Sequence, residues 1–266
     1  MAGFTIFGAN GWIGSALARH LAGKGHHVRG ATRNDWPVAG QKLDNVIYAI
    51  GLTADFRGRP VQTAQAHVET LLRVLERYSF ESFLYLSSTR VYRGAQATTE
   101  NAALLVNPTD PDDVYNVTKL AGESICLSQI QSRVRVVRIS NVVGPGDRSS
   151  NFLPSIVAEA RTKGRVLIRT SPDSEKDYFG LDDLLPLVEV VALEGRERLY
   201  NLASGRNVKH GEIAALIEQG LGAAVSFAEG APTVSFPRIA VDRIRCEFGF
   251  APSPFEQVFE KIVRDQ

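Results

Sequence analysis

The sequence predicts an α/β fold with a doubly wound parallel sheet and a small C-terminal lobe. Short β-branched or aromatic runs alternate along the chain with helical patterns, which is typical of βαβ units. The 266 residues suffice for one large domain, or for a domain with a small lobe. With 44% hydrophobic and 22% charged residues, the composition is that of an ordinary globular protein and argues against disorder.

The first half of the chain contains six expected elements. In order, they are a strand at residues 4–7, a helix at 12–22, strands at 27–31 and 45–50, a helix at 64–78 and a strand at 82–86. The first of these helices has Ile13, Leu17 and Leu21 on one face. Apolar residues recur at helical spacing in the second helix as well, and the run NVIYAI has the composition of a buried strand.

The second half of the chain continues this alternation. Its expected elements are a helix at residues 113–129, a strand at 134–139, helices at 152–160 and 182–193, a strand at 199–202 and a helix at 210–219. The helix at 113–129 follows Pro108 and Pro111, and the run VRVVRI has the β-branched composition of a strand.

The connection after the second strand is unusually short. Only twelve residues separate Arg33 from Val46. A full doubly wound sheet normally has a further helix and strand at this point. Because the segment NDWPVAGQKLDN is too short for both, we expect a shortened connection and a sheet with one strand fewer on that side.

A glycine-rich turn with the pattern GxxGxxG follows the first strand directly and leads into a helix. The turn residues that we expect to bind a cofactor are Gly8, Asn10, Gly11, Trp12, Ile13 and Gly14. In such a turn, glycines permit the tight bend, the approach of the backbone to a pyrophosphate and the packing of helix on strand. The helix N-terminus adds N–H groups and the positive end of its dipole. The turn therefore predicts a dinucleotide site, the alternative being a turn without a ligand.

The end of the second strand is expected to lie near the adenosine ribose of that dinucleotide. An acidic residue there would bond the 2′-hydroxyl of NAD, whereas an arginine accommodates the 2′-phosphate of NADP. Thr32 stands at the acidic position and Arg33 follows it. Because a guanidinium suits a phosphate, NADP is the preferred cofactor and NAD the alternative. A solvated surface arginine is the other explanation for Arg33.

Tyr115 and Lys119 are four residues apart on an expected helix and so share one face. Upstream of them, Ser87 and Ser88 follow an expected sheet strand. The ordinary pKa of tyrosine is near 10, and a lysine ammonium and a positive nicotinamide ring favour its phenolate. Tyr115 would then exchange a proton with a substrate hydroxyl or carbonyl while hydride moves to or from the cofactor.

These motifs resemble those of the extended short-chain dehydrogenase/reductase superfamily, in its NAD(P)-dependent epimerase/dehydratase branch. The matching segments, in family order, are GANGWIG, NVIYAIG, LYLSSTRVY, YNVTK, RISNVVGPG and DYFGLDD followed by YNLASG. The resemblance implies a Rossmann-like fold and an enzyme that modifies nucleotide sugars. It gives Ser88 the catalytic Ser/Thr place, Tyr115 the general acid/base place, and Lys119 the place that binds the nicotinamide ribose and lowers the tyrosine pKa.

The resemblance assigns further residues to the cofactor and the substrate. Ile50 and Gly51 stand where the family usually has alanine and glycine lining the cofactor. Asn141 stands where members contact the nucleotide part of the substrate, with a structural turn residue as the alternative. Lys176 falls where an arginine often meets the substrate pyrophosphate, and lysine keeps the charge but loses the bidentate fork.

Two aromatic side chains have more ordinary expected roles. The shortened segment lacks the acidic residue that usually lies beside the adenine, so Trp36 is a candidate to hold the adenine. A packed or half-exposed tryptophan is the more common case. His67, on the helix expected at residues 64–78, is expected to be a packing or surface histidine.

Residues 1–143 with 177–204 are expected to form the dinucleotide-binding domain, and residues 144–176 with 205–266 the substrate-binding lobe. The implied function is NAD(P)-dependent oxidoreduction of a nucleotide-activated sugar, most simply reduction of a 4-keto sugar. The alternatives are an epimerase with retained NAD, a reductase of a small non-nucleotide carbonyl compound, and a catalytically silent dinucleotide sensor. A dehydratase is disfavoured, because family dehydratases generally carry Asp-Glu where this chain has Thr89 and Arg90.

The composition limits the partners. Lys+Arg is 30 and Asp+Glu is 29, and a net charge of +1 does not indicate a nucleic-acid binder. Two cysteines, Cys126 and Cys246, and scattered histidines argue against a disulfide framework and a metal site, and Cys126 is expected to be buried and inert. No long apolar stretch or signal peptide is recognised, so we expect no membrane partner and a cytoplasmic location. A homodimer is one expected assembly.

Overall fold

The computed structural model describes residues 1–32, 35–130 and 133–265, and the chain divides into two compact units. Unit 1 consists of Met1–Val91, Leu104–Ile139 and Leu185–Tyr200. Unit 2 consists of Tyr92–Ala103, Ser140–Leu184 and Asn201–Gln266. The functional domains expected from the sequence have somewhat different bounds, and their roles stay a prediction.

Six strands form the main sheet, in the order β2-β1-β3-β4-β5-β9. Their bounds are β1 Gly3–Phe7, β2 His27–Ala31, β3 Lys42–Tyr48, β4 Ser79–Ser88, β5 Val134–Ile139 and β9 Leu199–Leu202, the first two residues of β9 belonging to unit 1. The pairs β1–β2, β1–β3, β3–β4 and β4–β5 are all parallel. The predicted doubly wound, Rossmann-like α/β fold is therefore confirmed.

The short connection after β2 leaves that strand at the edge of the sheet. The described residues between β2 and β3 contain no helix, and only an isolated bridge joins Thr32 to Asp35. The chain then enters β3 at Lys42 and pairs on the other side of β1. The described residues therefore show one strand fewer on this side of the sheet, as expected.

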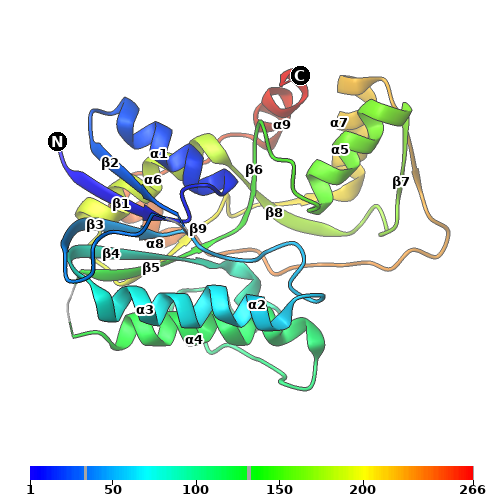
Figure 1. Ribbon diagram of the computed structural model, residues 1–266. Helices are drawn as coiled ribbons and strands as arrows, with labels where there is room; N and C mark the ends of the chain where they lie inside the picture. The colour runs from blue at the N-terminus through cyan, green and yellow to red at the C-terminus, as the bar shows by residue number, and fades with distance from the viewer. Residues whose placement is uncertain (33–34, 131–132, 266) are drawn as a thin grey trace. The chain divides into compact units, whose positions relative to one another are not determined.

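Helices lie on both faces of this sheet (Figure 1). One face carries α1 (Trp12–Gly23) and the unit 1 part of α6 (Leu181–Glu194), joined by His20 Nε2 and Glu189 Oε2 at 2.7 Å. The other face carries α2 (Pro60–Ala64), the π-helical turn η1 (Gln65–Glu69), α3 (Thr70–Arg77) and α4 (Val114–Ser128). Two single 3₁₀ turns, η2 (Thr89–Tyr92) and η3 (Pro111–Asp113), follow β4 and precede α4.

Aromatic residues of the strands fill the core beneath α3 and α4. Phe7, Tyr48, Phe83 and Tyr85 are fully buried there. The ring of Tyr48 stacks on that of Tyr85, with centroids 5.7 Å apart. Rings of this size bury much apolar area each, so they fix the strands against the two helices.

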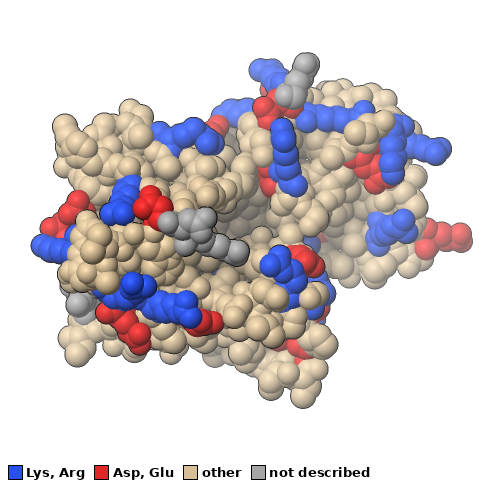
Figure 2. Space-filling model, in the orientation of Figure 1, with Lys and Arg blue, Asp and Glu red and all other residues tan. Residues whose placement is uncertain are grey.

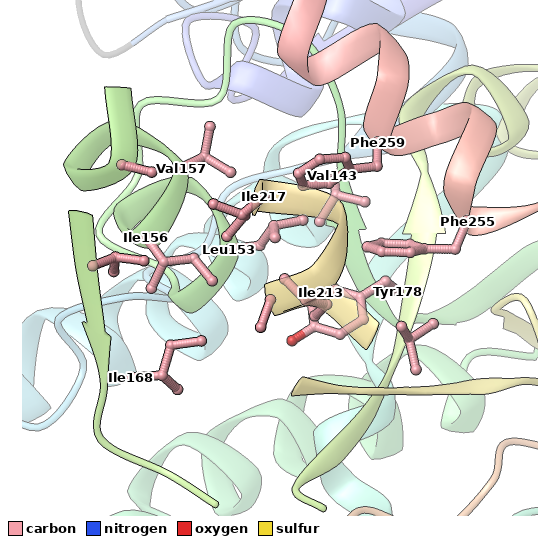
Figure 3. Close-up of a cluster of buried hydrophobic side chains, with 14 of the residues drawn as sticks. Val143, Leu153, Ile156, Val157, Ile168, Tyr178, Ile213, Ile217, Phe255 and Phe259 are labelled. Atoms are coloured by element: carbon pink, nitrogen blue, oxygen red, sulfur yellow. The ribbon is translucent and has the colours of Figure 1, made fainter. Parts of the chain in front are cut away.

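The described residues of unit 2 form two small sheets and four helices, three of which pack together in one cluster. Its strands are β6 Asn141–Val143, β7 Arg165–Ile168, β8 Glu175–Gly180, β10 Asn207–Lys209 and β11 Ala224–Phe227. Its helices are α5 Phe152–Lys163, α7 His210–Leu221, α8 Asp242–Phe248 and α9 Phe255–Arg264. Leu153 and Val157 of α5 meet Ile217 of α7 and Phe259 of α9 in one buried cluster (Figure 3).

Several expected elements differ from those observed. The strand expected at residues 45–50 begins earlier and ends at Tyr48, because Ala49 and Ile50 already leave the sheet. The helix expected at 64–78 begins at Pro60, whose fixed φ suits a first helical position, and it contains the π turn. The strands β6, β7, β8, β10 and β11 were not expected, because each is short and most carry charged or polar residues.

Charge is distributed without a dominant sign. Figure 2 shows Lys and Arg side chains among Asp and Glu side chains in small groups on the visible face. In the part of the chain that the structure describes, no helix is long and apolar enough to cross a membrane.

Candidate active site

The turn between β1 and α1 has a backbone that only glycine permits. Gly8 has a φ of +92°, and a Cβ on it would lie 2.9 Å from the backbone of Ala49. A Cβ on Gly14 would lie 2.2 Å from the Gly8 carbonyl oxygen, to which the Gly11 N–H donates at 3.0 Å. Helix and turn are therefore in direct contact, which is the geometry that a dinucleotide turn needs.

The N-terminus of α1 is suited to an anion. Gly11 is the N-cap and caps without a side chain, and no acidic residue lies in the first turn. Asn10 and Gly11 are exposed, while Trp12 and Ile13 are half-buried. The N–H groups and dipole of the helix thus meet no competing carboxylate in this turn, so these residues fit a pyrophosphate.

At the end of β2, Thr32 forms two backbone hydrogen bonds with Asp35. The Thr32 N–H donates to the Asp35 carbonyl at 3.3 Å, and the Asp35 N–H donates to Thr32 at 3.2 Å. The predicted 2′-phosphate ligand, Arg33, lies outside the described residues. Asp35 is exposed, and its carboxylate lies 3.7 Å from the Arg29 guanidinium.

Ser88, Tyr115 and Lys119 lie together in unit 1. Ser88 ends β4, its Oγ accepts the Arg90 N–H at 3.2 Å, and its side chain is near enough to the Tyr115 phenol on α4 to lower the pKa of that phenol. Lys119 follows one turn later on the same helix, and its Nζ donates to the Leu86 carbonyl at 2.9 Å. The three residues that the sequence suggested are therefore brought together by the end of one strand and one face of one helix.

Burial dominates the electrostatics of these groups. It raises the pKa of the Tyr115 phenol, while the hydrogen bond from Ser88 and the charge of Arg90 lower that pKa. Burial also lowers the pKa of Lys119 to about 8, against the attraction of Glu123, which raises it. In the protein without a bound cofactor, Ser88 and Arg90 are thus the groups that favour the phenolate form of Tyr115.

Ser87 makes a different contact from its neighbour Ser88. Its hydroxyl donates to Glu123, which is buried on α4 one turn beyond Lys119. Arg138 of β5 pairs with the same carboxylate, Nη2 to Oε2 at 2.7 Å. The Ser87 hydroxyl is thereby used in the core, which leaves Ser88 as the serine beside Tyr115.

A cluster of aromatic and cationic side chains surrounds Tyr115. The ring of Phe56 lies 5.3 Å from the Tyr115 ring, measured between centroids. The guanidinium carbon of Arg90 lies 5.1 Å, and that of Arg57 4.6 Å, from the centre of Phe56. Both arginines form ion pairs with Asp112, so one carboxylate pairs with two guanidinium groups. Sequence reasoning did not assign these side chains, since only the folded chain brings residues 56 and 90 beside Tyr115.

Gly51 lies beside Lys119, as expected for a residue near the catalytic helix. A Cβ on Gly51 would be 3.5 Å from both Lys119 Nζ and His67 Nε2. Ile50 is half-buried and packs against the core. His67 is fully buried, so it is a packed rather than a surface histidine.

Trp36 has the more common of its two expected roles, which is packing in the core. Its ring lies edge-on to Phe7 with centroids 5.3 Å apart, and its centroid is 6.5 Å from that of Tyr78. The tryptophan is therefore a partly buried member of the core, and nothing supports its use as an adenine platform.

The expected substrate residues Asn141 and Lys176 lie in unit 2. Asn141 begins β6, and its Nδ2 donates to the Asp177 carbonyl at 2.8 Å, so it joins two strands of the small sheet. The Lys176 ammonium lies 5.6 Å from the centre of the Phe236 ring. A cavity of about 570 Å³ in this unit is lined by Arg148 among others, and Lys176 is not part of its lining.

His210 of unit 2 is a buried polar residue that sequence reasoning also missed. Its ring stacks on Phe152 at 4.1 Å, and its Nδ1 is 2.6 Å from the Thr170 hydroxyl. The other ring nitrogen is buried and has no hydrogen-bond partner among the described residues. Burial and the charge of Lys176 lower its pKa to about 4. In the same described residues, no group of three or more His, Cys, Asp or Glu is placed to hold a metal ion.

Comparison with known proteins gives the family. Residues 4–203 match the NAD dependent epimerase/dehydratase family. The chain belongs to this family. The family recognised from the sequence motifs is therefore confirmed.

Two curated members of the epimerase/dehydratase family illustrate the range of relatives. The chain is 31% identical over 200 residues to GDP-6-deoxy-D-mannose reductase of Pseudomonas aeruginosa, covering 68% of this chain and 64% of that one. It is 28% identical over 204 residues to dTDP-glucose 4,6-dehydratase of Streptomyces griseus, covering 73% and 60%. The matched stretch is thus less than two thirds of the length of these relatives.

The fold of the family extends over the whole chain. The structure of RMD from Pseudomonas aeruginosa complexed with NADPH is similar with a TM-score of 0.81. The similarity covers 100% of this chain and 99% of that one at 24% sequence identity, which shows a common fold.

Proposed function

We propose that this chain is an NADP-dependent oxidoreductase that reduces the 4-keto group of a nucleotide-activated sugar, with Ser88, Tyr115 and Lys119 as its catalytic residues. The observation that carries the proposal is that the buried Lys119 of α4 donates to the Leu86 carbonyl of β4, which brings the face of α4 that carries Tyr115 to the end of the strand that carries Ser88. This arrangement can give a proton to a carbonyl oxygen or take one from a hydroxyl.

The residues divide the work as follows. When bound, the cofactor supplies the hydride that adds to the carbonyl carbon. Tyr115 gives its phenolic proton to the carbonyl oxygen, which becomes the new hydroxyl. Ser88 donates a hydrogen bond that stabilises the phenolate left behind, and the charge of Arg90 acts in the same direction. Lys119, held by the Leu86 carbonyl, keeps a cation beside Gly51.

The glycine turn and α1 would hold the cofactor pyrophosphate, with Ile50 and Gly51 beside the reacting end. We assign the preference for NADP to Arg33, and the match to a structure complexed with NADPH supports it. Substrate binding is assigned to Ser88, Asn141 and Lys176, with residues 144–176 and 205–266 as the substrate lobe.

Reduction is favoured over dehydration by the residue that follows Thr89. A dehydratase needs an acid in this part of the site, and here the Arg90 guanidinium stands over Phe56 and pairs with Asp112. A permanently charged guanidinium cannot donate the proton. The relative that is 31% identical is named a reductase of a GDP-activated sugar, which supports the same reading.

The experiment is run in the oxidation direction. The purified chain is incubated with NADP⁺ and GDP-6-deoxy-D-mannose, and then with 6-deoxyhexoses carried on UDP, CDP and dTDP, while NADPH absorbance is followed. Wild-type protein should form NADPH with at least one sugar of this series, and Tyr115→Phe should lose roughly 10²–10⁴-fold in turnover while cofactor affinity stays within about a few-fold.

Tyr200→Phe is the matched control, because it also removes one buried phenol hydroxyl, which accepts from the Glu197 N–H. This variant should keep its turnover. Turnover near the wild-type rate by Tyr115→Phe would overturn the proposed chemistry. Tightly bound NAD on the purified protein, with no net formation of NADPH, would point to an epimerase.

A further inference from the structure

The helix that packs against α4 contains a π turn beside the candidate active site. Residues Gln65–Glu69 form this turn within a continuous helix that runs from Pro60 to Arg77. A π turn inserts one extra residue per turn and frees main-chain carbonyls, and such turns are frequent at functional sites. The freed groups must find other partners where they are buried.

Two buried tyrosines of the sheet supply those partners. The Tyr48 hydroxyl of β3 donates to the Ala66 carbonyl at 2.5 Å, and the Tyr85 hydroxyl of β4 donates to the His67 carbonyl at 3.4 Å. On α4, Gly122 permits the close approach, because a Cβ there would lie 3.1 Å from the His67 carbonyl oxygen and 2.5 Å from the Tyr85 hydroxyl. The turn therefore packs against the sheet on one side and against α4 on the other.

The π turn points the His67 imidazole at α4. Its Nδ1 lies 2.8 Å from the Thr118 hydroxyl, and its Nε2 lies 3.4 Å from the Leu52 N–H. The Thr118 hydroxyl has one hydrogen, which it gives to the main-chain carbonyl of Val114 or Tyr115. Thr118 must then accept from Nδ1–H, so Nε2 carries the lone pair that faces the Leu52 N–H.

The same ring touches the candidate acid/base. The imidazole stands perpendicular to the Tyr115 ring, with an interplanar angle of 88° and centroids 5.1 Å apart. Tyr115, Thr118 and Lys119 are all on α4, so His67 contacts the turn of the helix that carries both reactive groups.

Burial, together with the charge of Lys119, keeps the imidazole neutral. The titratable groups that face it are Tyr115 and Lys119 from α4, Tyr85 from β4 and Tyr48 from β3. Burial and the nearby ammonium of Lys119 lower the pKa of His67 to about 2. A second cation beside Lys119 is thereby avoided.

We propose that His67 is a positioning residue of this enzyme: the π turn presses a neutral, Nδ1-protonated imidazole against Tyr115 and Thr118, and so fixes the phenol relative to Ser88 and Lys119. The proposal rests on the proposed function, because it assigns to His67 a role in the placement of Tyr115.

The kinetic test uses three variants and the best substrate of the nucleotide-sugar series with NADP⁺. His67→Phe keeps a ring against Tyr115 but loses both hydrogen bonds, Thr118→Val removes the partner hydroxyl, and His67→Asn places an amide nitrogen near the position of Nδ1. His67→Phe and Thr118→Val should each lower kcat on the order of 10- to 100-fold, as expected for a displaced catalytic group, with the NADP⁺ dissociation constant within about twofold. The double variant should be no worse than His67→Phe alone, because His67→Phe has already lost the hydrogen bond that Thr118→Val removes.

The pH profile separates positioning from a purely structural role. Ser88 lowers the pKa of the phenol, so a phenol displaced from Ser88 should titrate at higher pH. The midpoint of the kcat profile should therefore rise in His67→Phe and return toward the wild-type value in His67→Asn. A lower thermal midpoint with unchanged kcat and an unchanged pH midpoint would overturn the proposal. If Tyr115→Phe retains turnover, the proposed function fails, whereas an inactive Tyr115→Phe with a fully active His67→Phe refutes only the role of His67.

A measurement without substrate keeps the proposal falsifiable where a variant does not fold. Nitrogen-15 NMR of the imidazole groups of the whole chain, with His67 assigned from His67→Asn, should show one neutral tautomer with Nδ1 protonated from about pH 5 to about pH 9. A His67 signal that titrates near the ordinary histidine value of about 6.5, or that shows Nε2 protonated, would overturn the proposal.

Discussion

Glu123 and Arg138 form a bidentate ion pair in the interior of unit 1, on the helix that carries Tyr115. The side chains are only 3% and 5% exposed, and both Nε and Nη2 of Arg138 lie within hydrogen-bond distance of the carboxylate. Ser87 of β4 donates to the other oxygen. The pair thus links β4, α4 and β5 below the candidate site.

Removal of one partner of this pair should be strongly destabilising. Glu123→Ala leaves the Arg138 guanidinium buried without its counter-ion, which should cost about 3–5 kcal/mol of unfolding free energy. Denaturant unfolding of the variant measures the loss. Glu159→Ala is the control, because Glu159 pairs with Lys163 on an exposed helix face, where such pairs contribute about 0.3–0.5 kcal/mol. Equal losses in the two variants would contradict the interpretation.

Arg90 should set the titration of Tyr115. Its charge lowers the phenol pKa, so Arg90→Gln should move the midpoint of the kcat profile for sugar oxidation to higher pH. Arg90→Lys should shift it less, because a cation remains. Arg57→Gln is the control, since Arg57 binds the same Asp112 but is mostly exposed. A midpoint that stays in place in Arg90→Gln would show that the guanidinium does not act on the phenol.

Lys119 should leave a signature in the pH dependence of stability. Burial lowers its pKa to about 8, whereas an unfolded lysine titrates near 10.5. Between these values the unfolded state binds more protons than the native state, so this group makes unfolding free energy rise with pH. Wild type should therefore gain stability relative to Lys119→Met from about pH 8 to about pH 10. Denaturant unfolding of both proteins across that window tests the sign, and a difference that is flat or falls would refute it.

Much of unit 1 was predictable because its signals are local. The strands at residues 27–31, 134–139 and 199–202 have the predicted bounds, and α1 follows the glycine turn as expected. The spacing of Tyr115 and Lys119 also depends on one helix alone. By contrast, the π turn depends on hydroxyl groups of Tyr48 and Tyr85, which no local pattern of residues 65–69 reveals.

The neighbours of the site could not be predicted for the same reason. Phe56 lies in a loop without periodicity, and Arg90 follows the strand in a 3₁₀ turn, so only tertiary contacts bring them beside Tyr115. In unit 2 the strands are three to six residues long and bury few apolar residues each, which leaves hydrophobic periodicity too weak to detect.

Arg33 should decide between the two cofactors. If its guanidinium meets the 2′-phosphate, Arg33→Ala should weaken NADPH binding on the order of 10- to 100-fold and leave NADH binding nearly unchanged. Fluorescence titration with both cofactors measures this. Arg29→Ala is the control, because Arg29 is an arginine of β2 whose guanidinium pairs with Asp35. An equal loss for both cofactors, or no loss for NADPH, would show that Arg33 does not read the 2′ position.

Lys176 should bind the phosphates of the substrate. A nucleoside diphosphate brings two or more negative charges to a chain of net charge +1, so local cations must meet it. Loss of one charge-assisted contact should cost about 1.5–3 kcal/mol, which is roughly 10- to 150-fold in affinity. Lys176→Ala should therefore raise the dissociation constant for UDP, GDP, CDP or dTDP by this factor and leave cofactor binding intact, as measured by calorimetry.

Salt and a matched lysine complete the test of Lys176. Added salt should weaken diphosphate binding more in wild type than in Lys176→Ala, because salt screens an accessible ionic contact. Lys209→Ala removes an exposed lysine of the adjacent strand, which pairs with Asp173 at 2.9 Å, and should leave affinity unchanged. If none of the four diphosphates binds at millimolar concentration, a nucleotide sugar cannot be the substrate, because its diphosphate would have to occupy the same residues. Reduction of a small carbonyl compound without a nucleotide would then be the better account of Ser88, Tyr115 and Lys119.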